Sequence, residues 1–154
     1  MDPTLLLAGA AGLGGYGYWR PMQLFRHAVA ARLHLAGFRS HHVPLTRARV
    51  RVWTGGDGEP VVFVHGFGTE ASVNWHLQLP PARRRFRVIA PDLPGFGASD
   101  RVGDERTIAF QVDTLRELLA RLGHGPVRLV GHSMGGWISL AFAAAHPELV
   151  SQLV

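Results

Sequence analysis

The stretch "VRLVGHSMGGWISLAFAAAHPELV", Val127 to Val150, decides the fold that we predict for this chain of 154 residues. It begins as an apolar strand, passes through the pentapeptide Gly131–Gly135, and continues as a helix that ends near Pro147. Glycines on both sides of Ser133 allow a turn tight enough to hold the hydroxyl clear of the sheet. The turn also aims the first N–H groups of the helix at the same place, where they favour negative charge. Ser133 is therefore the candidate nucleophile.

A second glycine-rich loop, "HGFG" at residues 65–68, follows the apolar run Val61 to Val64. Acyl transfer at a serine needs two N–H donors for the oxyanion of its tetrahedral intermediate. The residue after the nucleophile, Met134, would supply one donor, and Phe67 in the second loop would supply the other. The two glycines of this loop allow it to approach the reacting centre closely.

Three apolar runs predict strands buried on both faces of a parallel sheet, with helices on both sides. The runs are Val61 to Val64, Val88 to Ala90 and Val127 to Val130. Helical spacing predicts a helix from Glu70 to about Leu79 and another over "TIAFQVDTLRELLARL", ended by Gly123. We place the helix after the third strand at Trp137 to Ala145, stopped near Pro147. "HHVPL" and "ARVRVWTGG", residues 41–45 and 48–56, predict an antiparallel pair at the sheet edge. In such sheets the ligand lies outside the carboxyl ends of the strands, where the glycine-rich loops fall.

Taken together, "VVFVHGFG", "NW" at Asn74–Trp75, "DLPGFGASD" and "GHSMGG" resemble the N-terminal half of an α/β-hydrolase-fold serine hydrolase. The similarity covers about Val43 to Val154. It implies a carboxylic-ester hydrolase of the esterase or lipase type, acting on a small-molecule ester or lipid through an acyl-enzyme at Ser133. It implies no metal and no organic cofactor, and it assigns the oxyanion hole to Phe67 and Met134.

The resemblance also narrows the family and leaves alternatives open. The apolar N-terminus is similar to that of the membrane-associated monoacylglycerol-lipase branch. Serine at the turn separates the chain from haloalkane dehalogenases and epoxide hydrolases, which carry Asp there. Hydrolases of carbon–carbon bonds, thioesterases and cofactor-free haloperoxidases share the serine turn and remain alternatives. A non-catalytic fragment that binds a membrane or a partner is the alternative from a different class.

The triad that the resemblance implies runs Ser, then Asp or Glu, then His, but only 21 residues follow Ser133. We expect His132 to point away from the hydroxyl, His65 to brace the oxyanion loop, and Asp92 to be structural. The chain is thus expected to be a fragment truncated within the sixth strand, without the triad acid and base and with little turnover alone. The strand Val127 to Val130 is expected to form an exposed apolar edge.

Composition excludes several classes of site. The chain has no cysteine, so it has neither a disulfide nor a thiolate metal site. Its 16 basic residues are all arginine and give a formal charge of +5. They are spread over predicted loops and helix faces, which favours a solvated surface attracted to anionic lipid over a nucleic-acid interface.

The N-terminal residues are organised differently from the rest. Residues 1–20 are apolar, and as a helix Pro3 to Trp19 would reach about 25 Å against a hydrocarbon core of about 30 Å. They predict a membrane anchor with the domain cytoplasmic, or otherwise a flexible or peripherally packed end of a cytoplasmic protein. Residues 21–42 predict a basic amphipathic helix and linker, lying on a membrane or packed on its own domain. Its apolar positions are Met22, Phe25, Val29, Leu33 and Ala36.

Overall fold

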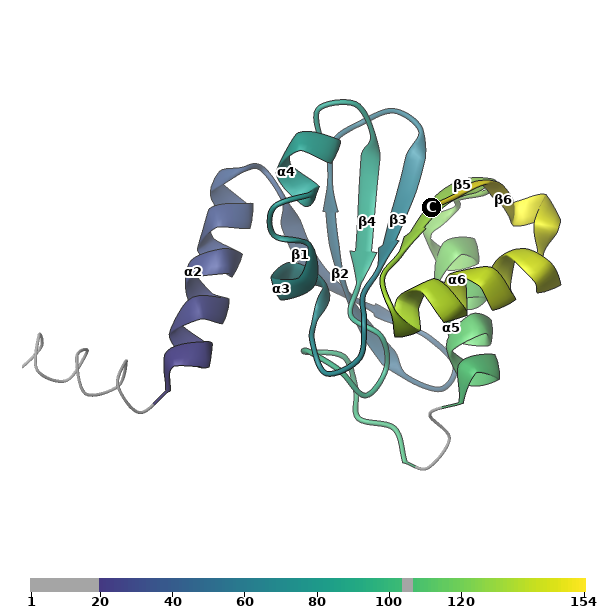
Figure 1. The fold of residues 1–154 in the computed structure, drawn as a ribbon, viewed down its shortest axis with the longest axis horizontal. Helices are drawn as coiled ribbons and strands as arrows, with labels where there is room; N and C mark the ends of the chain where they lie inside the picture. The colour runs from purple at the N-terminus through teal and green to yellow at the C-terminus, as the bar shows by residue number, and fades with distance from the viewer. Residues whose placement is uncertain (1–19, 104–106) are drawn as a thin grey trace, which may run out of the picture.

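A six-stranded sheet with the strand order β1-β2-β4-β3-β5-β6 forms the centre of the molecule (Figure 1). The computed structural model describes residues 20–103 and 107–154. The strands are β1 (Arg39–Pro44), β2 (Arg49–Gly55), β3 (Pro60–Val64), β4 (Arg87–Pro91), β5 (Val127–Gly131) and β6 (Val150–Leu153). The pairs β1–β2 and β2–β4 are antiparallel, and the remaining three pairs are parallel. The predicted mostly parallel α/β sheet with an antiparallel hairpin at its edge is confirmed.

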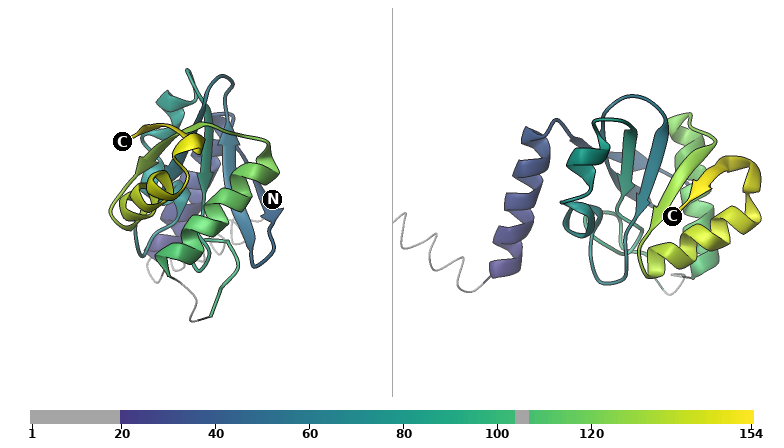
Figure 2. Two further views of the ribbon diagram at one scale, coloured as in Figure 1. Left: turned by 90° about the vertical axis from the view of Figure 1, so that its right-hand side faces the viewer. Right: turned by 45° about the horizontal axis from the view of Figure 1, so that its top comes forward.

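Helices cover both faces of this sheet, as the buried strands predict (Figures 1 and 2). They are α2 (Pro21–Leu35), α3 (Ala71–Trp75), α4 (Leu79–Ala82), α5 (Ile108–Leu122) and α6 (Met134–Ala145), with a 3₁₀ turn η1 at Pro147–Leu149. Because side chains alternate along a strand, β3 sends Val62 and Val64 to the core under α5 and α6. Val61 and Phe63 enter the core under α2, α3 and α4.

The prediction of an exposed apolar edge at Val127 to Val130 is wrong. β5 lies between β3 and β6, with Val64 paired to Gly131 on one side and Val127 paired to Val150 on the other. Val127 and Leu129 are completely buried. The four residues of β6 are enough to cover β5, so the outermost strand is the more polar segment Val150–Leu153.

The α5 helix agrees with its prediction at both ends. The Thr107 hydroxyl accepts a hydrogen bond from the Phe110 N–H at 3.1 Å, which caps the first turn. Gly123 ends the helix in the left-handed conformation with φ of 68°, where a Cβ would be strained. The α6 helix begins at Met134, one turn earlier than the predicted Trp137, so it starts directly at the candidate nucleophile.

The single helix predicted from Glu70 to about Leu79 is in fact two short helices. α3 ends at Trp75, and α4 begins at Leu79 with prolines in its first turn. Pro80 and Pro81 have no N–H to give to the preceding turn, so they fit only where a helix starts. The break directs the chain back over the sheet toward β4.

Only part of the predicted apolar stripe of α2 is buried. Val29 and Leu33 pack into the core, whereas Met22 is 58% exposed and Phe25 is 41% exposed. The second half of the helix is therefore buried in its own domain, whereas the first half makes surface contacts, with the Phe25 and His76 ring centroids 5.6 Å apart and Arg26 3.9 Å from Glu70. Among the described residues no helix is both long and apolar enough to cross a bilayer. The predicted anchor at residues 1–20 lies almost entirely outside the described residues.

Candidate active site

Ser133 sits in a backbone conformation that amino acids other than glycine rarely adopt. Its φ is 53° and its ψ is −118°, and it is the one non-glycine residue of the described chain with positive φ. It lies directly between the end of β5 and the first residue of α6, and its side chain belongs to the exposed surface. Such strain persists only where the surrounding structure imposes it, and it occurs mainly at functional sites.

The glycines on both sides of Ser133 are required because backbone atoms occupy the space of a side chain. A Cβ on Gly131 would lie 2.6 Å from the Gly136 Cα, and a Cβ on Gly135 would lie 2.1 Å from the Val64 carbonyl oxygen. Both distances are far below van der Waals contact. The turn that the sequence predicts at Gly131–Gly135 is therefore pressed against the end of β3.

The structure brings the "HGFG" loop beside this turn. β3 and β5 are neighbours in the sheet, and the His132 N–H donates to the Val64 carbonyl at 3.1 Å. Within the described residues the N–H groups of Phe67 and Met134 have no hydrogen-bond acceptor. Met134 is the first residue of α6, where an N–H lacks an intrahelical partner. The two predicted oxyanion donors are thus uncommitted, on adjacent loops at the carboxyl edge of the sheet.

His65 joins the "HGFG" loop to the loop that follows β4. Its side chain is fully buried, with Nδ1 2.7 Å from the Gly66 carbonyl and Nε2 2.9 Å from the Leu93 nitrogen. The Leu93 N–H can only donate, so Nε2 accepts and Nδ1 carries the proton. Burial lowers the pKa of His65 and keeps the ring neutral. The expectation that His65 braces this loop agrees with these contacts.

The buried Asp92 side chain holds the loop after β4 in place. Its carboxylate accepts hydrogen bonds from the Ala71 and Ala98 N–H groups, both at 2.9 Å, and lies 2.7 Å from Arg51 Nη2. The Arg51 contact is an ion pair without hydrogen-bond alignment. Burial raises the pKa of Asp92, and Arg51 and the two N–H donors oppose this shift. With all its contacts directed to structure, Asp92 fits the structural role expected of it.

Arg51 also forms an ion pair with Glu70, which lies at the start of α3. Its Nη2 lies 3.4 Å from Glu70 Oε2, and Glu70 Oε1 accepts a hydrogen bond from Ser72 at 2.7 Å. Glu70 directly precedes α3, so an arginine of β2 fixes both the start of α3 and the loop after β4. The sequence did not predict this network. The alternation of Arg49 and Arg51 with valines indicates a strand, but it does not indicate that Arg51 forms buried ion pairs.

Asn74 is a second residue whose role the sequence does not reveal. Its Oδ1 accepts the Gly66 N–H at 3.0 Å and lies 3.2 Å from His132 Nδ1. It appears in the sequence only as part of the "NW" pair that contributes to the family resemblance. The structure places it between the "HGFG" loop and the serine turn.

None of the histidines near the turn takes the role of general base. His132 is bound through Nδ1 to Asn74, and both ring nitrogens of His65 have partners. His146 caps the far end of α6. In the described part of the chain, no side chain forms a hydrogen bond with the Ser133 hydroxyl. The expectation that His132 points away from this hydroxyl is consistent with its bond to Asn74.

Aromatic side chains give the loops around Ser133 an apolar surface. Phe67 is 77% exposed, and its ring packs edge-on against Phe96 with centroids 5.6 Å apart. Phe96 in turn contacts the His65 ring at 5.5 Å. These three rings extend from the buried His65 to the exposed Phe67, whose own backbone N–H is a candidate oxyanion donor.

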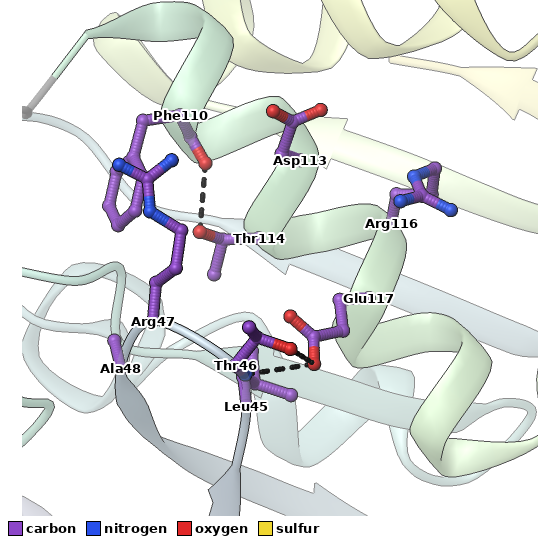
Figure 3. A pocket seen from close by; sticks show the side chains of 9 residues that line it. All are labelled: Leu45, Thr46, Arg47, Ala48, Phe110, Asp113, Thr114, Arg116 and Glu117. Carbon is purple, nitrogen blue, oxygen red and sulfur yellow. Dashed lines mark hydrogen bonds between the residues drawn. The ribbon is translucent and has the colours of Figure 1, made fainter.

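A cavity of about 420 Å³ lies between the β1–β2 turn and α5, away from Ser133 (Figure 3). In it Arg47 stacks over the Phe110 ring at 4.7 Å, and Glu117 accepts hydrogen bonds from the N–H and hydroxyl of Thr46. The Thr46 hydroxyl bond lowers the pKa of Glu117. Its polar groups hold the turn to the helix, and none comes from the loops at Ser133.

In the two described ranges, no group of histidine and carboxylate side chains could hold a metal ion.

Comparison with known proteins identifies a family match. The family described as alpha/beta hydrolase fold matches residues 59–154. A solved structure of a bacterial membrane phospholipase A has a TM-score of 0.80 and 33% identity, over 97% of this chain and 48% of that chain. The 2-hydroxy-6-oxo-2,4-heptadienoate hydrolase of Pseudomonas putida is 44% identical over 102 residues, which cover 64% of this chain and 37% of the relative.

Another relative carries a different activity in its name. The soluble epoxide hydrolase of a Corynebacterium species is 37% identical over 120 residues, covering 76% of this chain and 37% of the relative. The chain therefore spans little more than a third of the length of these curated relatives. The family match over residues 59–154 contains both glycine-rich loops, from which the candidate nucleophile and oxyanion donors come.

Proposed function

The chain belongs to the alpha/beta hydrolase fold family, and we propose that it is part of a carboxylic-ester hydrolase with Ser133 as nucleophile. The observation that carries this proposal is the positive φ of Ser133 between Gly131 and Gly135, where a Cβ has no room. A serine held in this way at the start of a helix presents its hydroxyl to substrate and directs helix N–H groups at the same point. This arrangement serves acyl transfer.

The proposed reaction is a two-step acyl transfer. The Ser133 oxygen bonds to the ester carbonyl carbon while a general base takes its proton, and the carbonyl electron pair becomes an oxyanion held by the Phe67 and Met134 N–H groups. Collapse of the intermediate breaks the carbon–oxygen bond, and the alcohol leaves with the proton. Water then releases the acid from the acyl-enzyme by the same route. We assign the base and its orienting acid to the longer protein, so the chain alone should turn over little ester.

The substrate class follows from the surface beside Phe67. An exposed aromatic ring next to a candidate oxyanion donor favours esters with an apolar acyl chain, because burying that ring against the chain removes both from water. The similarity to the membrane phospholipase A supports a lipid substrate. Hydrolysis of a carbon–carbon bond is the second candidate, favoured by the 44% identity to the heptadienoate hydrolase.

The test uses the full open reading frame that contains this chain. Hydrolysis of p-nitrophenyl esters with acyl chains of 2 to 12 carbons should rise with chain length, and Ser133→Ala should reduce kcat by at least about 10⁴-fold. A matched variant, Ser40→Ala on β1, should keep wild-type activity. If 2-hydroxy-6-oxo-dienoates are cleaved and esters are not, the ester assignment is wrong and the second candidate takes its place.

We also propose that the protein attaches to a membrane surface through the start of α2. Met22, Leu24 and Phe25 are exposed there, and Arg20 adds a cation suited to anionic lipid. This end of α2 lies at the same end of the sheet as the loops after β3 and β5 (Figures 1 and 2). Attachment would therefore hold Ser133 near the lipid, with the domain on the cytoplasmic side.

Sedimentation with vesicles containing phosphatidylglycerol tests this attachment. Deleting residues 1–20 or combining Met22→Ser with Phe25→Ser should reduce the bound fraction several-fold. The control is Leu35→Ser, which changes an exposed residue at the other end of the same helix and should not affect binding. A wild-type protein that stays in the supernatant would rule out the attachment.

A further inference from the structure

The side-chain oxygen of Asn74 connects two loops that are far apart in the sequence. It contacts Gly66 in one loop and His132, 66 positions later, in the other. It accepts the Gly66 N–H at 3.0 Å and faces His132 Nδ1 at 3.2 Å. Gly66 directly precedes Phe67, and His132 directly precedes Ser133. One oxygen atom thus touches the immediate neighbours of the candidate nucleophile and of a candidate oxyanion donor.

The hydrogen-bond donors and acceptors determine the orientation of the Asn74 amide and the tautomer of the His132 ring. The Gly66 N–H can only donate, so Asn74 must present its oxygen to it, and the same oxygen then faces His132. An oxygen acceptor requires His132 Nδ1 to carry a proton. The neutral ring must therefore be the Nδ1–H tautomer.

Helix α3 and close packing hold this oxygen in place. The Asn74 N–H donates to the Glu70 carbonyl at 2.9 Å, and the next residue, Trp75, is buried against Phe63 with ring centroids 5.2 Å apart. The loops are also in contact: a Cβ on Gly66 would lie 2.9 Å from His132 Nδ1. A small shift of either loop would therefore break the contacts that Asn74 makes.

We propose that Asn74 is a positioning residue that fixes the spacing between the Phe67 N–H and the Ser133 turn. Because its oxygen accepts the Gly66 N–H, the His65–Gly66 peptide plane keeps one orientation. The next peptide plane, which carries the Phe67 N–H, is held at the Gly66 carbonyl by His65 Nδ1, and among the described residues the Phe67 N–H has no acceptor. Because it also holds the His132 ring, the turn that carries Ser133 and Met134 keeps its place relative to that donor. This inference rests on the proposed function of Ser133.

Two substitutions of similar size separate positioning from packing. Asn74→Asp keeps an acceptor oxygen at the same reach, whereas Asn74→Leu keeps the volume and removes the acceptor. In the full-length protein Asn74→Leu should lower kcat for its ester substrate about 10- to 100-fold with KM changed less than about threefold, as expected when one oxyanion contact is misplaced. Asn74→Asp should stay within about fivefold of wild type. The control Gln78→Leu removes an exposed amide outside both loops and should have no effect.

A second readout does not depend on activity. Nitrogen NMR of the His132 ring at neutral pH should report the Nδ1–H tautomer in wild type and a shift toward Nε2–H in Asn74→Leu. Equal kcat in the Leu and Asp variants, or an unchanged His132 tautomer in Asn74→Leu, would overturn the positioning role. If wild type hydrolyses no ester while the tautomer changes as expected, the bridge stands and the proposed function fails instead.

Discussion

Two loops at the carboxyl edge of the sheet are held by opposite means. The serine turn after β5 is fixed by backbone atoms, because Gly131 and Gly135 press against neighbouring main chain. The loop after β4 is fixed by a buried side chain, Asp92, which receives two N–H groups of other segments and the Arg51 guanidinium. Both loops are held by distant segments: the serine turn packs against the Val64 and His65 carbonyls, whereas the loop after β4 depends on Arg51, 41 positions earlier in the numbering.

The difference predicts how each loop fails. A change of one methyl group should break the serine turn, since the backbone cannot move aside. The loop after β4 should tolerate changes of shape and fail when a charge loses its partner.

Gly135→Ala should give the largest loss of stability. The added Cβ would meet the Val64 carbonyl oxygen at 2.1 Å and the His65 carbonyl oxygen at 2.5 Å. We expect a loss of at least about 4 kcal/mol in the free energy of unfolding, or failure to fold. The neighbouring Gly136→Ala meets nothing closer than 3.6 Å and should be neutral or stabilising by up to about 1 kcal/mol. Urea unfolding of the pair measures both, and equal losses would refute the steric account.

Arg51→Met should destabilise the protein by about 3 kcal/mol, because it leaves Asp92 buried without its cation and leaves Glu70 with only the 3.9 Å contact to Arg26. The control is Arg49→Met two residues earlier on β2. Arg49 pairs with Asp100 at 3.4 Å in an exposed position, so its loss should stay below about 1 kcal/mol. Similar unfolding midpoints for the two variants would show that the buried network does not hold the loop.

Ser133→Gly should stabilise the fold by about 1 to 2 kcal/mol, because glycine adopts the conformation of Ser133 without strain. Ser133→Ala retains the Cβ and should leave stability nearly unchanged. Calorimetric melting temperatures of the two variants separate strain from loss of the hydroxyl. A melting temperature of the glycine variant at or below that of the alanine variant would mean that the turn stores no strain.

His65 should make stability depend on pH. Burial lowers the pKa of His65 in the folded protein. Below about pH 6.5 this histidine is therefore protonated in the unfolded chain but remains neutral in the folded protein. Stability should therefore fall as pH drops from 8 to 5, by at most about 1.4 kcal/mol for each pH unit from this group.

His65→Gln, which cannot titrate, should reduce that fall in urea unfolding. His124 provides the background, since partial burial and Arg87 lower its pKa and it acts in the same direction in both proteins. An identical pH dependence in wild type and His65→Gln would contradict the neutral, buried state assigned to His65.

The same contrast explains what the sequence could predict. The serine turn, the "HGFG" loop and the buried strands could be predicted because their characteristic residues are adjacent in the sequence. The order of β5 and β6 was not, since pairing between strands depends on crossovers and four residues of "VSQL" carry little apolar signal. The break between α3 and α4 could have been predicted from Pro80 and Pro81, because prolines favour the first turn of a helix. The contacts of Arg51 and Asn74 join segments far apart in the chain and have no local signature.

Reaction with a fluorophosphonate tests the central claim, that Ser133 is the nucleophile, most directly. In this reaction the serine oxygen bonds to phosphorus and fluoride leaves, so the adduct marks the attacking residue. Peptide mass spectrometry of the full-length protein should find the adduct on Ser133, and Ser133→Ala should remain unlabelled. A folded wild-type protein that stays unmodified, or that carries the adduct on another residue, would contradict the account.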